Sequence, residues 1–195
     1  MGSFLAAVVL LTATPGPGVL SVAGVGAAYG RRAGLRFVLG VFIGTNAVAI
    51  LAASGLAAVV MAEPRLRLAL TVVSVGYLGW LALRIAMQGD RIALATHARP
   101  PGVAGGIVLQ LANPKCHAVN LSLFSGFPIS GFGVGAEIAV KFAVINAVWV
   151  PVHFAWLAGG NALSRVDMTP GSRRALNLAM AMAMLAAVAL ALAAG

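Results

Sequence analysis

The chain has 195 residues, of which 61% are hydrophobic and only 9% are charged. A soluble domain carries roughly 25% charged residues, so this composition excludes an ordinary water-soluble fold. The formal net charge is +9, but the arginines stand beside apolar runs, which indicates contact with anionic lipid headgroups rather than with nucleic acid.

Long hydrophobic runs alternate with short charged or glycine-rich segments along the chain. Because about 20 apolar residues are needed to cross the hydrocarbon core of a bilayer, we predict an all-α, polytopic membrane protein with one transmembrane domain over residues 1–195. In chain order, the expected transmembrane helices cover residues 3–28, 37–61, 66–87, 103–127, 136–161 and 174–194. The expected breaks between them are 31–34, 62–65, 88–101, 131–135 and 164–174.

Two groups of helix breakers interrupt the first and fourth expected spans. Thr14-Pro15-Gly16-Pro17-Gly18 lies in the first span, and Ala112-Asn113-Pro114-Lys115 lies in the fourth. A proline inside a helix removes a hydrogen bond, and within lipid the freed carbonyl groups need partners in the protein or in a water-lined cavity. The two breaks therefore indicate a central cavity, although a proline that only kinks a helix for packing is the simpler alternative.

The two breaks are also matched in position. Pro15 and Pro114 are 99 residues apart, and Asn46 corresponds to Asn146 at an offset of 100. The halves, about residues 1–90 and 100–195, each hold three expected spans, so they insert with opposite orientation. This predicts a 3+3 inverted repeat with broken helices 1 and 4, an arrangement typical of secondary transporters.

Several short motifs in this order resemble the LysE/RhtB family of small-solute exporters. They are Thr14-Pro15-Gly16-Pro17, Gly30-Arg31-Arg32-Ala33-Gly34, Gly40 and Gly44, Gly76-Tyr77-Leu78-Gly79-Trp80-Leu81-Ala82-Leu83-Arg84, and Asn113-Pro114-Lys115. The resemblance covers nearly the whole chain. It implies an exporter of amino acids or their derivatives driven by the proton gradient, and related branches of the family move metal cations.

The sequence departs from the family pattern at three places. The first motif continues with Gly18 where the family usually has asparagine, and Thr45-Asn46 stands where an acidic residue is common. Cys116-His117-Ala118-Val119-Asn120 follows the second break, where the family usually has alanine and aromatic residues.

The positions of the acidic residues narrow the substrate class. Glu63, Asp90, Glu137 and Asp167 all lie in or near expected loops. A metal ion or a dicationic solute held in the membrane needs a compensating charge, so a zwitterion fits better. Its carboxylate can bind the N–H groups at the start of a broken helix, and the carbonyls of residues 14–18 can accept its ammonium group.

The candidate substrate-binding residues follow from the two breaks and the polar positions near them. They are Thr14, Pro15, Gly16, Pro17, Gly18, Asn46, Asn113, Pro114, Lys115 and Asn146. Lys115 has two equally weighted roles. It pairs with the substrate carboxylate, or it snorkels to the nearer interface or caps carbonyls of the opposite broken helix. His153 and His117 are candidates for carrying a coupling proton, and a neutral, hydrogen-bonded histidine is the alternative for each.

Basic residues predict the orientation. The first, third and fifth loops hold nine, and the opposite side holds three, so the positive-inside rule places those three loops in the cytoplasm and both termini outside. Glycines spaced four apart, such as Gly40 and Gly44, allow close helix packing within the bundle or a homodimer.

Together with the family resemblance, which implies export and coupling to protons, these patterns predict an inner-membrane exporter of a neutral amino acid or a derivative, working by proton antiport. No His-Glu-x-x-His motif and no Ser/His/Asp set is present, so we expect no enzyme activity, no cofactor and no bound metal. The expected partners are membrane lipids and an amino-acid-like solute. The alternatives are a metal-cation exporter of the same superfamily and a membrane scaffold or assembly subunit that transports nothing.

Overall fold

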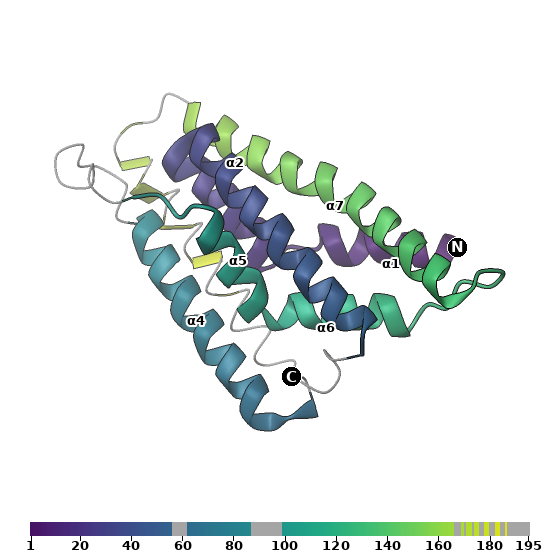
Figure 1. Cartoon of the computed structure of the whole chain (residues 1–195). Coiled ribbons are helices and arrows are strands. Elements are labelled where there is room, and N and C mark those ends of the chain that lie inside the picture. Colours follow the sequence, from purple (N-terminus) through teal and green to yellow (C-terminus); the bar gives the residue numbers. More distant parts are fainter. Residues whose placement is uncertain are drawn as a thin grey trace.

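The computed structural model describes residues 1–55, 62–86 and 99–165, with residues 169, 171–172, 174–175, 178–179, 182–183 and 186 beyond them. The sixth expected span, 174–194, and the expected break at 88–101 therefore lie mostly outside the described residues. The helices of the described part are α1 (Gly2–Ala13), α2 (Pro17–Ala53), α4 (Pro64–Ala86), α5 (Val103–Ala112), α6 (Pro114–Ser125) and α7 (Val134–Arg165) (Figure 1).

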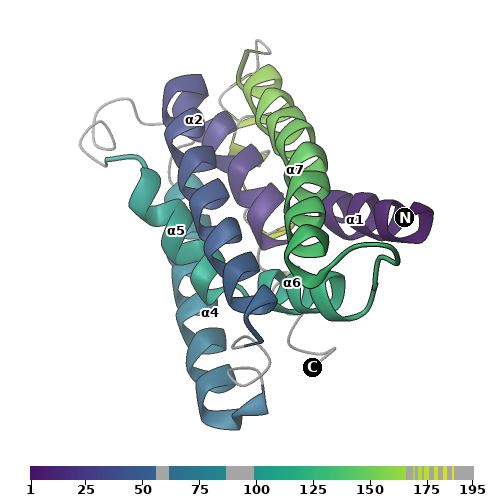
Figure 2. The same ribbon diagram turned by 45° about the vertical axis from the view of Figure 1, so that its right-hand side comes forward.

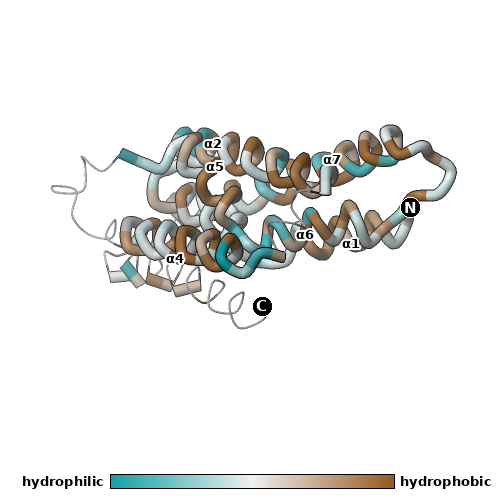
Figure 3. The backbone as a smooth tube through the Cα atoms, turned by 60° about the horizontal axis from the view of Figure 1, so that its bottom comes forward, coloured by the Kyte–Doolittle hydropathy of each residue, from teal (hydrophilic) through white to brown (hydrophobic). Residues whose placement is uncertain are grey.

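The described helices are apolar along their length. Three helical stretches, Pro17–Ala53, Pro64–Leu83 and Val134–Leu163, are long and apolar enough to cross a membrane. Figure 3 shows hydrophobic residues distributed along every labelled helix. Large apolar side chains such as Leu10 and Leu68 are exposed, and such residues suit contact with lipid. The all-α fold expected from the sequence is confirmed.

Helix α2 is a hairpin of two helical limbs rather than one straight helix. Gly18 and Gly44 both face the side chain of Gln110, yet a straight helix would separate them by about 39 Å at 1.5 Å per residue. The chain reverses at Gly30, whose φ of 78° and ψ of 178° are not helical. Residues 17–29 and 31–53 are therefore the two limbs (Figure 2).

The hairpin turn differs slightly from the sequence prediction. We expect a break over residues 31–34, but Arg31 already lies in the second limb, and the turn is made at Gly30. A positive φ is accessible to glycine because it has no Cβ to clash with the backbone. One glycine therefore completes the reversal of the chain, and the hairpin does not need a loop of several residues.

Both expected proline breaks are present. Helix α1 ends at Ala13 and α2 begins at Pro17, whereas α5 ends at Ala112 and α6 begins at Pro114. Thr14 and Asn113 each precede a proline and have ψ values of 126° and 107°. The proline ring clashes with a helical residue before it, so each helix ends there. Pro17 and Pro114 then start the next helix, where a missing N–H is tolerated.

Two hydrophobic clusters hold the helices together. The first includes Val25, Phe37 and Leu81 and joins both limbs of α2 to α4, α5 and α7. The second includes Phe4 and Leu123 and joins α1, α6 and α7. Figure 2 shows α1 crossing α7 at a steep angle. Helices α1 and α6 both pack against α7 through the second cluster. The helix breaks lie at the C-terminal end of α1 and at the N-terminal end of α6.

Glycines bring α2 and α5 into backbone contact. A Cβ atom added at Gly40 would lie under 3.0 Å from the Val103 carbonyl oxygen, and one at Gly106 would lie 2.5 Å from the Phe37 carbonyl oxygen. Gly44 likewise packs against Gln110. These glycines therefore serve packing within the bundle. The homodimer that the same spacing allows stays a prediction.

We expect Gly106→Ala to lower the thermal stability of the purified protein in detergent. The new methyl group meets backbone atoms that cannot move aside, and overpacking of this kind costs about 1–3 kcal/mol. Gly79→Ala is the matched control, because a Cβ there has no atom of the described residues within 4 Å. Equal melting temperatures for the two variants would contradict this packing role.

Candidate functional site

A cavity of about 70 Å³ lies between the two helix breaks. Residues from both limbs of α2 and from α1, α5, α6 and α7 line it: Leu11, Thr12, Thr14, Gly16, Gly18, Val19, Thr45, Gln110, Asn113, Lys115, Cys116, Val119, Asn120, Leu123, Ile145, Trp149 and His153. Leu123 and Ile145 belong to one hydrophobic cluster and Trp149 to the other. The cavity therefore sits between the two clusters that pack the bundle.

Lys115 connects the two broken helices. Its Nζ donates to the Thr14 carbonyl oxygen at 2.8 Å and approaches the Pro15 carbonyl oxygen at 3.4 Å. These carbonyls follow the C-terminus of α1, where the helix dipole is negative and favours a cation. Of the two roles expected for Lys115, this contact is the carbonyl-capping one. It also occupies two of the carbonyls, those of Thr14 and Pro15, that the sequence assigns to the substrate's ammonium group.

The second break is held by a buried chain of hydrogen bonds. The Asn113 Oδ1 accepts from the Lys115 backbone N–H at 3.1 Å and so caps α6. The Asn113 Nδ2 donates to the Gln110 Oε1 at 2.9 Å, and the Gln110 Nε2 donates to the Thr45 Oγ1 at 2.6 Å. The Thr45 hydroxyl donates to the Val41 carbonyl oxygen. This chain links the break to the second limb of α2.

The two candidate histidines have different positions. The His117 Nε2 lies 2.8 Å from the Leu111 carbonyl oxygen, and His117 does not line the cavity. His153 lines the cavity, stacks on the Trp149 ring with centroids 3.6 Å apart, and places Nδ1 3.0 Å from the Trp149 carbonyl oxygen. Since a carbonyl only accepts, the His153 Nδ1 carries a hydrogen. Its Nε2 is then the acceptor in the neutral ring.

The asparagines at matched positions pair with each other. The Nδ2 of Asn46 donates to the Oδ1 of Asn146 at 3.1 Å, and the reverse bond measures 3.0 Å. Each Nδ2 also donates to a carbonyl four residues earlier, of Phe42 and Phe142 respectively. Neither asparagine lines the cavity. Pro15, Pro17 and Pro114 are likewise absent from its lining, so they shape the site through the backbone.

Thr45, Gln110 and Asn120 line the cavity but are not among the candidates named from the sequence. All three are buried. The sequence does indicate that these three residues face the bundle interior, because a polar side chain within an apolar span is costly in contact with lipid. The sequence alone does not show which interior surface each one faces.

The cavity has an electropositive wall. No carboxylate is found among the described residues that line it, whereas the Lys115 ammonium group is present. At the start of α2, Pro17 has no N–H and Leu20 donates to the Gly16 carbonyl oxygen. Gly18 and Val19 remain at the cavity, and α2 has no side-chain cap. Uncapped N–H groups at a helix N-terminus favour an anion.

Comparison with known proteins identifies the family. A model of the LysE type translocator family matches residues 9–195. The chain therefore belongs to the LysE-type translocator family. It is 31% identical over 164 residues to the uncharacterized membrane protein PA4757 of Pseudomonas aeruginosa. The aligned region covers 80% of this chain and 76% of that protein. No solved structure matches it.

Membership in this family defines the general activity. LysE-type translocators export small solutes across a membrane and are transporters, not enzymes. This translocator is therefore a multi-pass membrane protein, as its composition predicts, and the cavity between its helix breaks is the candidate site for the solute.

We expect Lys115→Met to lower the melting temperature of this translocator and to slow transport. Two carbonyl groups at the end of α1 lose their shared donor, and a carbonyl group without a partner is costly where lipid, which offers no hydrogen bonds, surrounds it. Lys115→Arg is the control, because it keeps a charged donor of similar reach. If the methionine variant were as stable and as active as the wild type, the bridge between the breaks would have no importance.

Proposed function

We propose that this translocator exports a small neutral amino acid, or a derivative with both charged groups, across the bacterial inner membrane in exchange for protons. The observation that supports this proposal is the cavity between the two helix breaks, which the uncapped start of α2 lines. A carboxylate is the group that such N–H donors favour. The nearby Lys115 ammonium group adds to the positive potential.

The size of the cavity supports a small solute. Its volume of about 70 Å³ is well below the roughly 300–1,000 Å³ that is typical of sites for drug-sized ligands. The walls combine apolar side chains, such as Val119 and Ile145, with the polar groups of the breaks. A solute with a short side chain and a zwitterionic head group matches this combination of apolar and polar walls.

The proposed 3+3 inverted repeat is supported by a symmetric contact. Asn46 and Asn146 correspond at an offset of 100 residues, and each donates to the other. Phe42 and Phe142, whose carbonyls they also bind, have the same offset. Equivalent residues that contact each other reciprocally are expected at a two-fold axis. An axis of this kind in the membrane plane relates the halves of many transporters.

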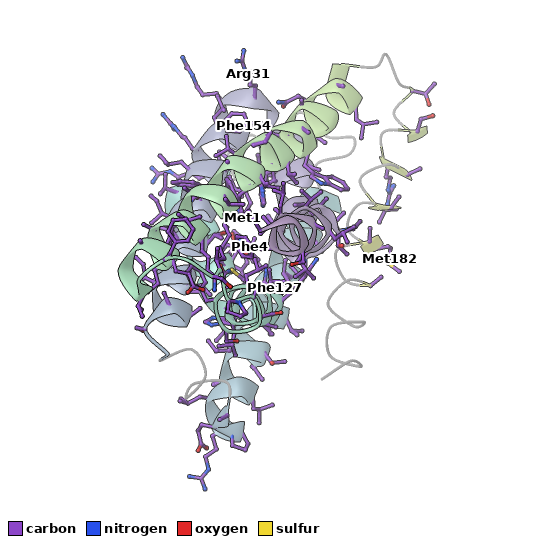
Figure 4. All side chains as sticks on the ribbon, turned by 90° about the vertical axis from the view of Figure 1, so that its right-hand side faces the viewer. Met1, Phe4, Arg31, Phe127, Phe154 and Met182 are labelled. Carbon is purple, nitrogen blue, oxygen red and sulfur yellow. The ribbon has the colours of Figure 1, made fainter. Side chains whose placement is uncertain are left out.

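The proposed orientation places both termini outside and the Gly30 turn in the cytoplasm. Arg31 and Arg32 are exposed at this turn, and Figure 4 shows Arg31 at one end of the bundle, well apart from Phe4 and Phe127. Positively charged residues at one end favour the cytoplasmic side.

We expect counterflow of small neutral amino acids in proteoliposomes that contain the purified protein. Labelled glycine, L-alanine and L-serine should exchange with unlabelled internal pools several-fold faster than in protein-free vesicles, because a carrier exchanges solute without an imposed gradient. No exchange across a wide amino-acid panel, with protein shown to be folded, would contradict the proposal. Divalent cations would then be tested next.

His153 is the proposed carrier of the coupling proton. Histidine is the side chain whose unperturbed pKa lies nearest the physiological range, and the His153 ring lines the cavity. We expect His153→Gln to retain counterflow and to lose the acceleration of export that an inward proton gradient produces. His117→Gln is the matched control, because His117 does not line the cavity. Full proton coupling in the His153 variant would exclude this role.

A further inference from the structure

Asn120 lines the cavity and holds a buried acceptor without a partner. Its side chain lies on α6, shortly after the second break, and is only 3% exposed. It lines the cavity, and its Oδ1 is buried with no hydrogen-bond partner. Leaving a buried acceptor unsatisfied costs about 1–3 kcal/mol, so this atom calls for a partner that the described residues do not supply.

The orientation of the Asn120 amide follows from its neighbour. The nitrogen assigned as Nδ2 lies 2.8 Å from the Cys116 carbonyl oxygen and 3.6 Å from the Cys116 Sγ. A carbonyl oxygen only accepts, so the atom that faces it must be the NH₂ group. A flipped amide would bring two oxygens together. The unpaired atom is therefore the oxygen, and its partner must be a donor.

The other amide oxygens of the cavity are already used. The Gln110 Oε1 accepts from Asn113, and the Asn113 Oδ1 accepts from the Lys115 backbone. The Thr14 and Pro15 carbonyls accept from the Lys115 Nζ. Among the buried side-chain atoms without a partner in the described part, the Asn120 Oδ1 is the one whose residue lines the cavity.

We propose that the Asn120 Oδ1 accepts a hydrogen bond from the α-ammonium group of the transported amino acid. This inference rests on the proposed function and specifies it. The carboxylate binds at the uncapped start of α2, and the ammonium group binds Asn120 on α6. The two charged groups of one solute then bridge the two broken helices. A carboxylic acid without an amino group leaves the Asn120 oxygen unpaired and is rejected for that reason.

Matched pairs of solutes test this assignment in the intact, reconstituted protein. Glycine, L-alanine and L-serine are compared with acetate, propionate and 3-hydroxypropionate, which lack only the amino group. Inhibition of labelled amino-acid counterflow gives an apparent affinity for each solute. For the wild type we expect each amino acid to bind at least about 10-fold more tightly than its partner, because sites that hydrogen-bond a polar group reject analogues without it.

For Asn120→Ala we expect this preference to fall to near unity, through weaker amino-acid binding with no change for the acids. Asn120→Ser is the second variant, because a serine hydroxyl can donate to the carbonyl four residues earlier and so keep the Cys116 bond while losing the amide oxygen. Ser125→Ala is the control. It removes another polar side chain of α6 that donates to the carbonyl four residues earlier but does not line the cavity, and it should leave the preference unchanged.

The outcomes separate this inference from the proposed function. If the wild type exchanges amino acids and both Asn120 variants keep the full preference, Asn120 does not bind the ammonium group, and export of amino acids still stands. If the wild type exchanges no amino acid, the proposed function fails first. An equal loss of preference in Ser125→Ala would show a general effect of weakened packing and would overturn the assignment.

Discussion

An interrupted helix inside a bilayer is the constraint on which this structure depends. Lipid offers no hydrogen bonds, so every backbone group released at a break must find a partner within the protein or in an enclosed polar cavity. At the first break the Thr14 and Pro15 carbonyls find that partner in Lys115, which belongs to the second break. At the second break the Asn113 side chain caps α6, and hydrogen bonds run from Asn113 through Gln110 to Thr45 on α2. The first break is therefore completed by a residue of the second, so the two lie face to face.

Close backbone packing makes these contacts possible. The hairpin turn at Gly30 brings the second limb of α2 back beside the first, and Gly40 and Gly106 let that limb touch α5. Only at such short separation does the Gln110 side chain reach Thr45. The glycines, which carry no polar group of their own, thus determine whether the polar chain at the break can form. The polar groups at the break can therefore find their hydrogen-bond partners only because the helices pack this closely.

The sequence predicts the helix breaks well because their cause is local. A proline acts on its own turn and on the residue before it, which favours helix ends at Thr14 and Asn113. Proline alone does not decide the break, because Pro151 lies inside α7 without ending it. The direction in which each helix faces is a different matter. Helices that are apolar on all sides give no stripe to orient them, and hence the sequence does not show that Asn46 and Asn146 bond to each other. For the same reason it does not show that Thr45, Gln110 and Asn120 line the cavity. The turn is made by Gly30 alone, and the sequence places it one residue too late because charged residues such as Arg31 and Arg32 are typical of a loop.

The two breaks are alike in position but differ in chemistry, and Lys115 explains the difference. Both new helices begin with a proline, yet α6 has Asn113 as a side-chain cap and α2 has Gly16. A Cβ atom at position 16 would lie 2.9 Å from the Lys115 Nζ, so the lysine that crosses here to reach the Thr14 carbonyl favours glycine at this position. Glycine has no side chain with which to cap a helix. The interaction that satisfies the end of α1 therefore leaves the start of α2 open to an anionic group. The bridge that stabilises the broken helix and the electropositive wall of the cavity have the same origin.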